Sequence, residues 1–266
     1  MKRFFVNVKL TVTNCIRYLP LLGNLISRGL KRKYRRSILG YVWCVLNPLL
    51  VMLIMNFVFS HMFSSSIANF PVYLFCGRMM FSFITDSTSA MENSILSNGS
   101  LMRKTRVPYY MFPLSAFCTS VVNFLFSLVA FGLVLLFTGT PVSVHVAAFP
   151  LVLLEMFAFS FGLGLFLAQA NVFIRDVNYL YAVFITGWMY LTPLFYPLSS
   201  LPEVLQYLIT YFNPACYFVD QSRAIFLNHA WPDGALLLRG AVAAVVFLAL
   251  GLFSYGRAKD KLILYV

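Results

Sequence analysis

The sequence predicts an all-α membrane protein with six transmembrane helices. Hydrophobic residues make up 61% of its 266 residues and charged residues only 11%, and the mean hydropathy is +0.82. A soluble domain has ~45–50% apolar and ~25% charged residues, so a soluble fold could not bury this excess. The apolar residues also occur in runs close to the ~20 residues that a helix needs to cross the bilayer core.

Six runs are predicted to span the bilayer, at 42–63, 70–96, 114–137, 146–170, 179–196 and 235–256. No internal repeat relates one half of the chain to the other. We therefore expect one transmembrane domain over residues 1–266. It divides into a basic segment at 1–40, a six-span bundle at 42–256 and a tail at 257–266.

Residues 21–38 are predicted to form an amphipathic helix in the membrane interface. Apolar residues recur there every four positions, at Leu22, Ile26, Leu30, Tyr34 and Ile38. Basic residues fill much of the remainder: Arg28, Lys31, Arg32, Arg35 and Arg36. Such a helix places its cations near anionic headgroups. Packing on a cytoplasmic partner is the alternative, and both can hold.

Basic residues between the spans predict the orientation. The N-terminal segment has ten Lys and Arg, the loop 97–113 has three, the loop 171–178 has one and the tail has three. The opposite side has only Arg223, in the segment 197–234. Because cytoplasmic loops carry the excess of Lys and Arg, both termini are expected in the cytoplasm of a multi-pass inner-membrane protein. This placement of the charges also argues against nucleic-acid binding, despite the net charge of +12.

The second predicted span is unusually polar, with Arg78, Asp86, Glu92 and the hydroxyl cluster Thr85, Ser87, Thr88 and Ser89. The fourth contains Glu155. Ionisable residues in a membrane usually face the bundle interior or a wet cavity. Hydrogen bonding between helices is the favoured interpretation, and a proton relay is the alternative.

No arrangement of residues predicts catalysis. The sequence has no Gly-rich phosphate loop, no H-E-x-x-H and no G-x-S-x-G motif, so no cofactor is expected on this chain. The histidines His61, His145 and His229 are far apart in sequence. We expect neither an enzyme nor a metal site.

Two features, one in the fifth span and one after it, each allow two interpretations. The segment 197–234 fits either a pair of short re-entrant helices broken at Asn213-Pro214 or an external loop with an interfacial helix. Aromatic residues cluster nearby at Trp188, Tyr190, Phe195 and Tyr196. They fit either an interfacial aromatic belt or a pore in which rings stack on sugars.

Five short patches in order resemble a known family. They are Arg36-Ser-Ile-Leu-Gly-Tyr-Val-Trp43 with Leu46-Asn-Pro-Leu49, Asn98-Gly-Ser-Leu-Met-Arg-Lys104 with Val107-Pro108 and Phe112-Pro-Leu114, Asn171-Val-Phe-Ile-Arg-Asp-Val177, Thr192-Pro-Leu-Phe-Tyr-Pro197, and Phe212-Asn-Pro214 with Asp220-Gln-Ser-Arg223. Over about residues 30–256 the chain resembles the permease subunits of type-2 ABC exporters that export polysaccharides in O-antigen, capsule and teichoic acid pathways. It departs from the common pattern at Arg78, where an apolar residue is expected after Gly77.

The resemblance implies a homodimer with two copies of a separate cytoplasmic ATP-binding subunit, which would bind ATP and Mg. It implies a coupling helix at about 98–110, a second contact near residue 175 and gating helices after the fifth span. The implied ATPase-coupling residues are Leu101, Arg103, Lys104, Arg106, Arg175 and Asp176. The implied contacts to the substrate headgroup are Arg28, Lys31, Arg32, Arg35 and Arg36.

The same resemblance implies that a lipid-linked glycan passes outward through a pore lined by the first and fifth spans. The candidate channel residues are Phe57, Trp188, Thr192, Phe195 and Tyr196. Trp188, Thr192 and Phe195 are expected on one helical stripe. The rival classes are a proton-coupled carrier using Asp86, Glu92 or Glu155, and a membrane glycosyltransferase or acyltransferase acting on lipid-linked sugars.

Overall fold

In the computed structural model the described residues are 18–31, 37, 39–63, 67, 69–104, 107–258 and 265, and no strand occurs among them. The first described helix covers residues 18–31. The further helices are α2 (Trp43–Phe63), α3 (Phe70–Ser97), α4 (Gly99–Lys104), α5 (Met111–Phe137), α6 (Phe149–Phe173), α7 (Val177–Leu191), α8 (Glu203–Phe212), α9 (Pro214–Phe226) and α10 (Gly234–Ala258). Short 3₁₀ turns lie at Gly40–Val42, Val144–Ala148 and Leu198–Ser200. The predicted all-α class is confirmed.

Among the described residues, four helical stretches are long and apolar enough to cross a membrane: Gly40–Ser60, Met111–Phe137, Val144–Phe173 and Gly234–Ala258. They correspond to the first, third, fourth and sixth predicted spans. The second predicted span forms α3, which is long but polar. The fifth forms α7, whose 15 residues extend only ~22 Å, short of the ~30 Å hydrocarbon core.

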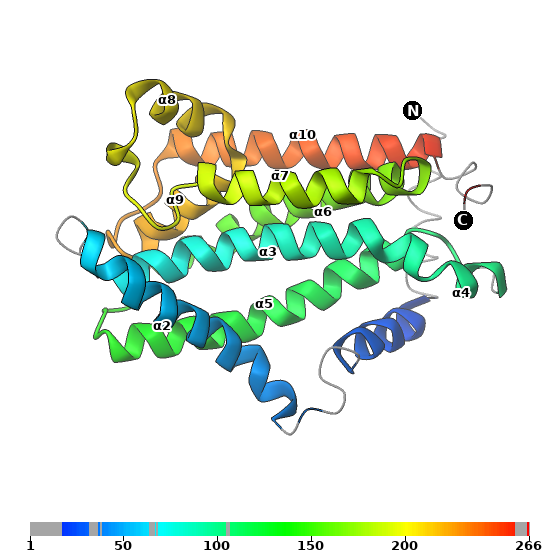
Figure 1. The fold of residues 1–266 in the computed structure, drawn as a ribbon, viewed down its shortest axis with the longest axis horizontal. Helices are drawn as coiled ribbons and strands as arrows, with labels where there is room; N and C mark the ends of the chain where they lie inside the picture. Colours follow the sequence, from blue (N-terminus) through cyan, green and yellow to red (C-terminus); the bar gives the residue numbers. More distant parts are fainter. Residues whose placement is uncertain are drawn as a thin grey trace.

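The polar helix α3 lies at the centre of the bundle. It is flanked by α5 on one side and by α6 and α7 on the other (Figure 1), and nineteen of its 28 residues are buried. Thr85, Ser87, Thr88, Glu92 and Ser94 are among these buried residues, so they face protein rather than lipid, which is where a membrane protein tolerates polar side chains.

Helices α6 and α10 pack with their backbones in close approach. A Cβ atom at Gly162 would lie 2.3 Å from the carbonyl oxygen of Phe247, and one at Gly251 would lie 2.3 Å from that of Gly162. Small residues commonly allow such approach between transmembrane helices. The glycine pair thus fixes α10 on the bundle.

We expect Gly162→Ala to lower the thermal unfolding midpoint of the purified protein in detergent, because the new methyl group must push α6 and α10 apart. Overpacking of this kind destabilises by ~1–3 kcal/mol. The matched control is Gly132→Ala in α5, where a Cβ atom would meet nothing within 4 Å. Equal midpoints for the two variants would contradict the close packing.

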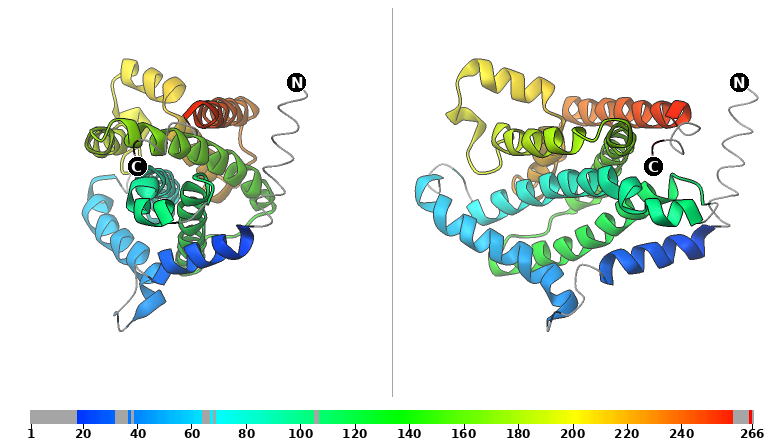
Figure 2. Two further views of the ribbon diagram at one scale, coloured as in Figure 1. Left: turned by 90° about the vertical axis from the view of Figure 1, so that its right-hand side faces the viewer. Right: turned by 45° about the vertical axis from the view of Figure 1, so that its right-hand side comes forward.

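Helix α2 crosses the bundle obliquely. Its end near Phe63 lies beside the start of α3, while its beginning at Trp43 diverges from α3 and α5 (Figures 1 and 2). The helix at 18–31 and α4 lie toward one end of the bundle, and α8 and α9 lie at the other (Figure 1). These ends are called the α4 end and the α8 end below.

The fifth predicted span is shorter than expected. Helix α7 ends at Leu191, and the backbone of Thr192 is extended. Pro193 follows and has no N–H with which to continue the helix. The prediction of helix through residue 196 is therefore wrong for residues 192–196.

The break at Asn213-Pro214 in the segment 197–234 lies where it was predicted. The Asn213 side chain accepts a hydrogen bond from the backbone N–H of Ala215 and so caps α9, with Pro214 in the first turn. Ten of the 13 residues of α9 are buried, against α3, α6 and α10. α8 is mostly exposed and has one buried residue, Ile209.

Candidate functional site

A long cavity of about 640 Å³ lies between α2, α3 and α5. Leu25, Arg28 and Gly29 of the helix at 18–31 border it toward the α4 end, and Phe195 borders it toward the α8 end. This cavity is called the groove below. Its polar lining residues are Arg28, Asn47, Arg78, Ser82, Asp86, Ser94, Ser97, Asn98, Ser115, Thr119, Ser120, Asn123 and Ser127.

Helix α3 forms one wall of the groove, and every fourth residue from Leu74 onward is among those that line it. The lining positions are Leu74, Phe75, Arg78, Met79, Ser82, Phe83, Asp86, Ala90, Ser94 and Ser97, followed by Asn98 just after the helix. Residues four apart lie on nearly the same face of a helix. From Leu74 to Ser97 the helix rises ~34 Å, which exceeds the ~30 Å of a bilayer core. The groove therefore follows the whole length of the central helix.

Helix α5 forms a second wall, lined with hydroxyl and amide groups at Ser115, Thr119, Ser120, Asn123 and Ser127. The hydroxyl of Ser115 donates to the carbonyl oxygen of Phe112 at 2.8 Å, and that of Thr119 donates to the carbonyl of Ser115 at 2.7 Å. Donation back to the helix leaves each hydroxyl oxygen able to accept a bond from a ligand. This wall was missed from sequence, although the four- and five-residue spacing of its polar residues was a visible signal.

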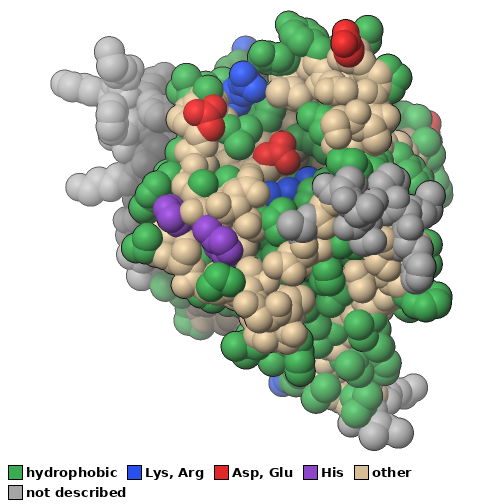
Figure 3. Space-filling model, turned by 90° about the vertical axis from the view of Figure 1, so that its left-hand side faces the viewer, with side chains coloured by type: hydrophobic (Ala, Val, Ile, Leu, Met, Phe, Trp, Pro, Cys, Tyr) green, Lys and Arg blue, Asp and Glu red, His purple; other side chains and the backbone are tan. Residues whose placement is uncertain are grey.

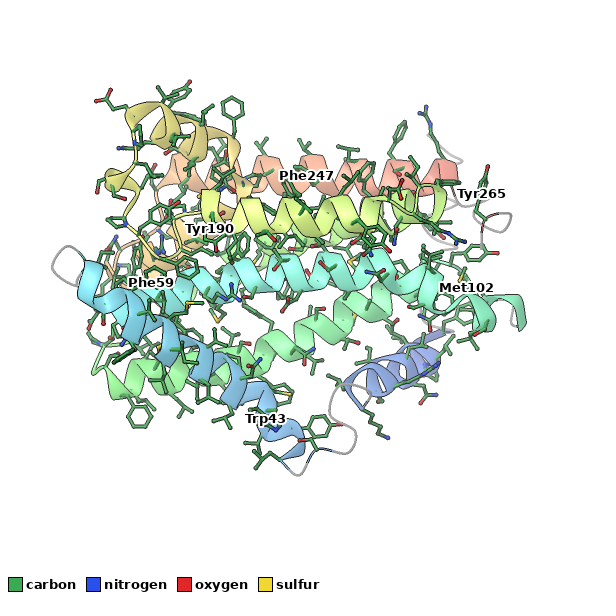
Figure 4. All side chains as sticks on the ribbon, in the orientation of Figure 1. Trp43, Phe59, Met102, Tyr190, Phe247 and Tyr265 are labelled. Carbon is green, nitrogen blue, oxygen red and sulfur yellow. The ribbon has the colours of Figure 1, made fainter. Side chains whose placement is uncertain are left out.

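At the α8 end the groove is bordered by Phe195, which belongs to a pair of stacked phenyl rings. Phe195 stacks on Phe59 of α2 with a centroid distance of 5.2 Å and an interplanar angle of 14°. Figure 4 shows Phe59 at this end of α2 and Trp43, which also lines the groove, at the opposite end of the helix.

The loop that carries Phe195 is held from two helices. The hydroxyl of Tyr73 in α3 donates to the carbonyl oxygens of Tyr196 at 2.8 Å and Pro193 at 3.3 Å. Arg223 of α9 donates to the carbonyl of Leu194 at 3.3 Å. The same guanidinium lies 3.5 Å from the centroid of the Tyr73 ring and 3.6 Å from the carboxylate of Asp220.

A second connection joins the end of α7 to the start of α9. The indole N–H of Trp188 donates to Oδ1 of Asn213 at 2.7 Å, and Nδ2 of Asn213 donates to the hydroxyl of Thr192 at 3.0 Å. Trp188 also packs edge-on against Phe81, with a distance of 5.6 Å between the ring centroids. Trp188 and Thr192 thus position the joint between α8 and α9.

Of the five predicted channel residues, Phe195 is the one that lines the groove. Trp188 and Thr192 are buried, Tyr196 is half-buried, and Phe57 is 75% exposed on α2. The expected stripe of Trp188, Thr192 and Phe195 is not formed, because α7 ends before Thr192. Tyr190 is 62% exposed and lies on the outside of the bundle (Figure 4).

The hydroxyl cluster predicted on α3 faces its neighbours and not the groove. Thr85, Ser87 and Thr88 are buried and donate to carbonyl oxygens of their own helix, and the hydroxyl of Thr88 lies 2.6 Å from that of Tyr181. These contacts fit the interpretation of hydrogen bonding within and between helices.

The three membrane carboxylates lie in different environments. Asp86 is exposed and lines the groove. Glu92 is 1% exposed, and its backbone carbonyl accepts a bond from the amide of Asn171 at 3.3 Å. Glu155 is buried and accepts a bond from Gln221 at 3.0 Å. Glu155 therefore fits a helix-packing role.

The predicted coupling and headgroup residues are grouped toward the α4 end. Leu101, Arg103 and Lys104 lie in α4, and Arg175 and Asp176 are exposed in the turn between α6 and α7. Arg28 and Lys31 are exposed on the helix at 18–31. Arg32, Arg35, Arg36 and Arg106 lie outside the described residues.

The α8 end has a different surface. Figure 3 shows mostly hydrophobic and uncharged side chains there, with scattered acidic, basic and histidine residues. The rings of His145 and Trp231 pack edge to face with a centroid distance of 5.2 Å. Among the residues that the structure describes, no three His, Cys, Asp or Glu side chains are grouped to hold a metal ion.

Comparison with known proteins extends over most of the chain. The family model for the ABC-2 type transporter matches residues 20–227. The O-antigen export system permease protein RfbA of Myxococcus xanthus is 33% identical over 238 residues, which cover 89% of this chain and 92% of that protein. RfbA of Klebsiella pneumoniae is 30% identical over 209 residues, which cover 78% and 80%.

Proposed function

Because this chain belongs to the ABC-2 type transporter family, we propose that it is the permease subunit of an ATP-driven exporter of a lipid-linked polysaccharide. The substrate would leave the cytoplasmic side of a bacterial inner membrane. The similar proteins of Myxococcus xanthus and Klebsiella pneumoniae are named O-antigen export permeases, which supports the substrate class. The observation that carries the proposal is the polar groove along a bundle that is otherwise strongly apolar.

In this proposal the groove is the path of the glycan. Sugars present hydroxyl groups that donate and accept hydrogen bonds, and two walls of the groove offer hydroxyls and amides at regular intervals. A polar group in a membrane needs such partners because lipid supplies none. The stacked rings of Phe59 and Phe195 would form the outer closure and would separate when the path opens.

We further propose six spans, with the α4 end in the cytoplasm. The asymmetry of Lys and Arg supports this orientation, and α3 and α7 lie alongside the four apolar helices (Figure 1). α8 and α9 would then form a re-entrant pair at the outer face. The burial of α9 supports re-entry, because non-helical backbone such as the joint at Asn213 is tolerated at membrane depth only within protein.

Labelling of single cysteines in a variant without the native five tests this topology. A membrane-impermeant maleimide should modify Ser199→Cys and Asn228→Cys, both exposed near the α8 end, in intact spheroplasts. It should modify Lys104→Cys and Arg175→Cys only after the membrane is permeabilised. The reverse pattern would contradict the orientation.

The proposed assembly has two copies of this chain and two copies of a separate ATP-binding subunit, which would bind ATP and Mg. A second copy could also cover the exposed aromatic residues Phe57 of α2 and Tyr190 of α7, which do not line the groove. The channel assignment of Phe57, Trp188, Thr192, Phe195 and Tyr196 thus stays a prediction. The headgroup would be attracted by Arg28, Lys31, Arg32, Arg35 and Arg36, each worth ~1 kcal/mol near an anionic surface.

The decisive test is ATP-dependent export by the chain and its ATPase partner in proteoliposomes. Lipid-linked glycan supplied on the ATPase side should become accessible to a glycosidase enclosed in the vesicles. Transport driven by a proton gradient without the ATPase would instead support the carrier alternative.

A further inference from the structure

Arg78 is a charged residue in the part of the groove toward the α8 end. It is half-buried on the α3 wall, where Leu74, Phe75 and Met79 are the lining residues around it on the same helix. Its Nη1 atom donates to the sulfur of Met189 at 3.3 Å. A thioether is a weak acceptor, so this contact does not balance the charge.

Two other arginines, Arg223 and Arg239, have contacts typical of a structural role. Arg223 is 6% exposed, and it has an ion pair, an aromatic ring and a backbone carbonyl as partners. Arg239 lies over the ring of Tyr211 at 4.4 Å and donates to the carbonyl of Thr210. Both tie helices together. Arg78 faces the groove, and its hydrogen bond among the described residues goes to sulfur.

The charges that line the groove are not balanced. Its described lining includes two cations, Arg28 and Arg78, and one carboxylate, Asp86. Asp86 acts electrostatically on Arg78 from a position eight residues along α3, a rise of ~12 Å. A charged side chain within a membrane protein is a candidate for a functional contact. A path for a neutral polymer would not need a cation.

We propose that Arg78 is a specificity-determining residue that recognises anionic substituents, so that the groove accepts an acidic glycan bearing carboxylate or phosphate groups. This inference rests on the proposed function. A planar guanidinium matches both groups with two parallel hydrogen bonds. The serine, threonine and asparagine residues of the walls would bind the sugar hydroxyls, and Arg78 would select for charge. Asp86, on the same wall, would oppose the acidic substituent.

The test measures oligosaccharide binding to the complete transporter in nanodiscs, by titration calorimetry at low salt. The probes are trigalacturonate, which is acidic, and maltotriose, which is neutral and of equal length. Arg78→Gln should weaken trigalacturonate binding about tenfold or more, or ~1.4 kcal/mol or more, and leave maltotriose unchanged. Arg78→Lys should retain part of the preference for trigalacturonate over maltotriose, and Asp86→Asn should strengthen that preference.

The control is Arg239→Gln, which removes the same charge outside the groove and should leave the preference intact. A preference that survives Arg78→Gln, or that falls equally in Arg239→Gln, would overturn the role of Arg78 while leaving the glycan path in place. Absence of a preference for the acidic probe in the unaltered transporter would overturn it as well. If neither sugar binds the unaltered transporter, the glycan path itself is wrong, and the inference fails with it.

Discussion

Replacing Asn123 by Phe should reduce polysaccharide export at least tenfold without preventing folding. Asn123 lies on the α5 wall midway along the groove, so the larger ring would occupy open space and not a packed core. Its Oδ1 atom is buried without a hydrogen-bond partner among the described residues. Removing the amide therefore gives up no contact that the structure records. A phenyl ring there would narrow the groove and remove a partner for sugar hydroxyls.

The matched control for this prediction is Leu125→Phe, two residues along α5. Leu125 is 52% exposed and does not line the groove, so the same ring would face the surroundings of the bundle. Surface glycan is measured by immunoblotting of whole cells, and permease abundance by blotting of the membrane fraction. Normal export by Asn123→Phe would mean that the glycan passes elsewhere, such as between two copies of the chain.

The helices could be predicted from sequence because hydropathy alone defines most of them. The runs that became α2, α5, α6 and α10 are long and almost free of charge, and lipid tolerates little else. The break at Asn213-Pro214 was also predictable, since Asn caps and Pro starts a helix. The end of α7 was missed because residues 192–196 are mostly apolar and aromatic, and hydropathy does not register Pro193.

The groove could not be predicted because it depends on how three helices are placed. α2 diverges from α3 and α5, and no pattern within α2 shows this. The resemblance and the aromatic composition predicted Trp188 and Thr192 as channel residues, but both instead hold the joint before α9. The small polar residues of α5 did not predict a groove wall, because serine and threonine can form hydrogen bonds within their own helix and so carry a weak signal.

The contacts at the α4 end show how movement of α4 would reach the bundle. Met102 of α4 is 8% exposed and belongs to a small apolar cluster with Ile95, Phe112, Ala168, Val172 and Ala258. These residues come from α3, α5, α6 and α10, and Figure 4 shows Met102 at this end. Leu101 packs against the same cluster. A force on α4 would therefore act on both helices that form the polar walls of the groove.

Reversing the charges of α4 should consequently abolish export while leaving the protein inserted in the membrane. Arg103 and Lys104 occupy the last positions of α4, and a partner surface of complementary sign would be repelled by Arg103→Glu with Lys104→Glu. Bringing like charges together at an interface costs several kcal/mol of binding free energy, which is enough to lower the affinity for the ATP-binding subunit more than ~100-fold. The measurement is co-purification of the ATP-binding subunit with the tagged permease, together with surface glycan.

The control for this variant is Lys259→Glu with Lys261→Glu, which changes the net charge of the tail by the same amount and should leave both readouts near normal. Membrane insertion is checked by the labelling pattern of Asn228→Cys in the altered background. Two results would separate the possible failures. If the ATP-binding subunit still co-purifies but export is lost, then α4 transmits movement to the bundle and is not needed for docking of the subunit. Export at the normal level would show that the ATPase does not depend on the basic residues of α4, and would leave the exposed turn at Arg175 and Asp176 as the remaining candidate contact.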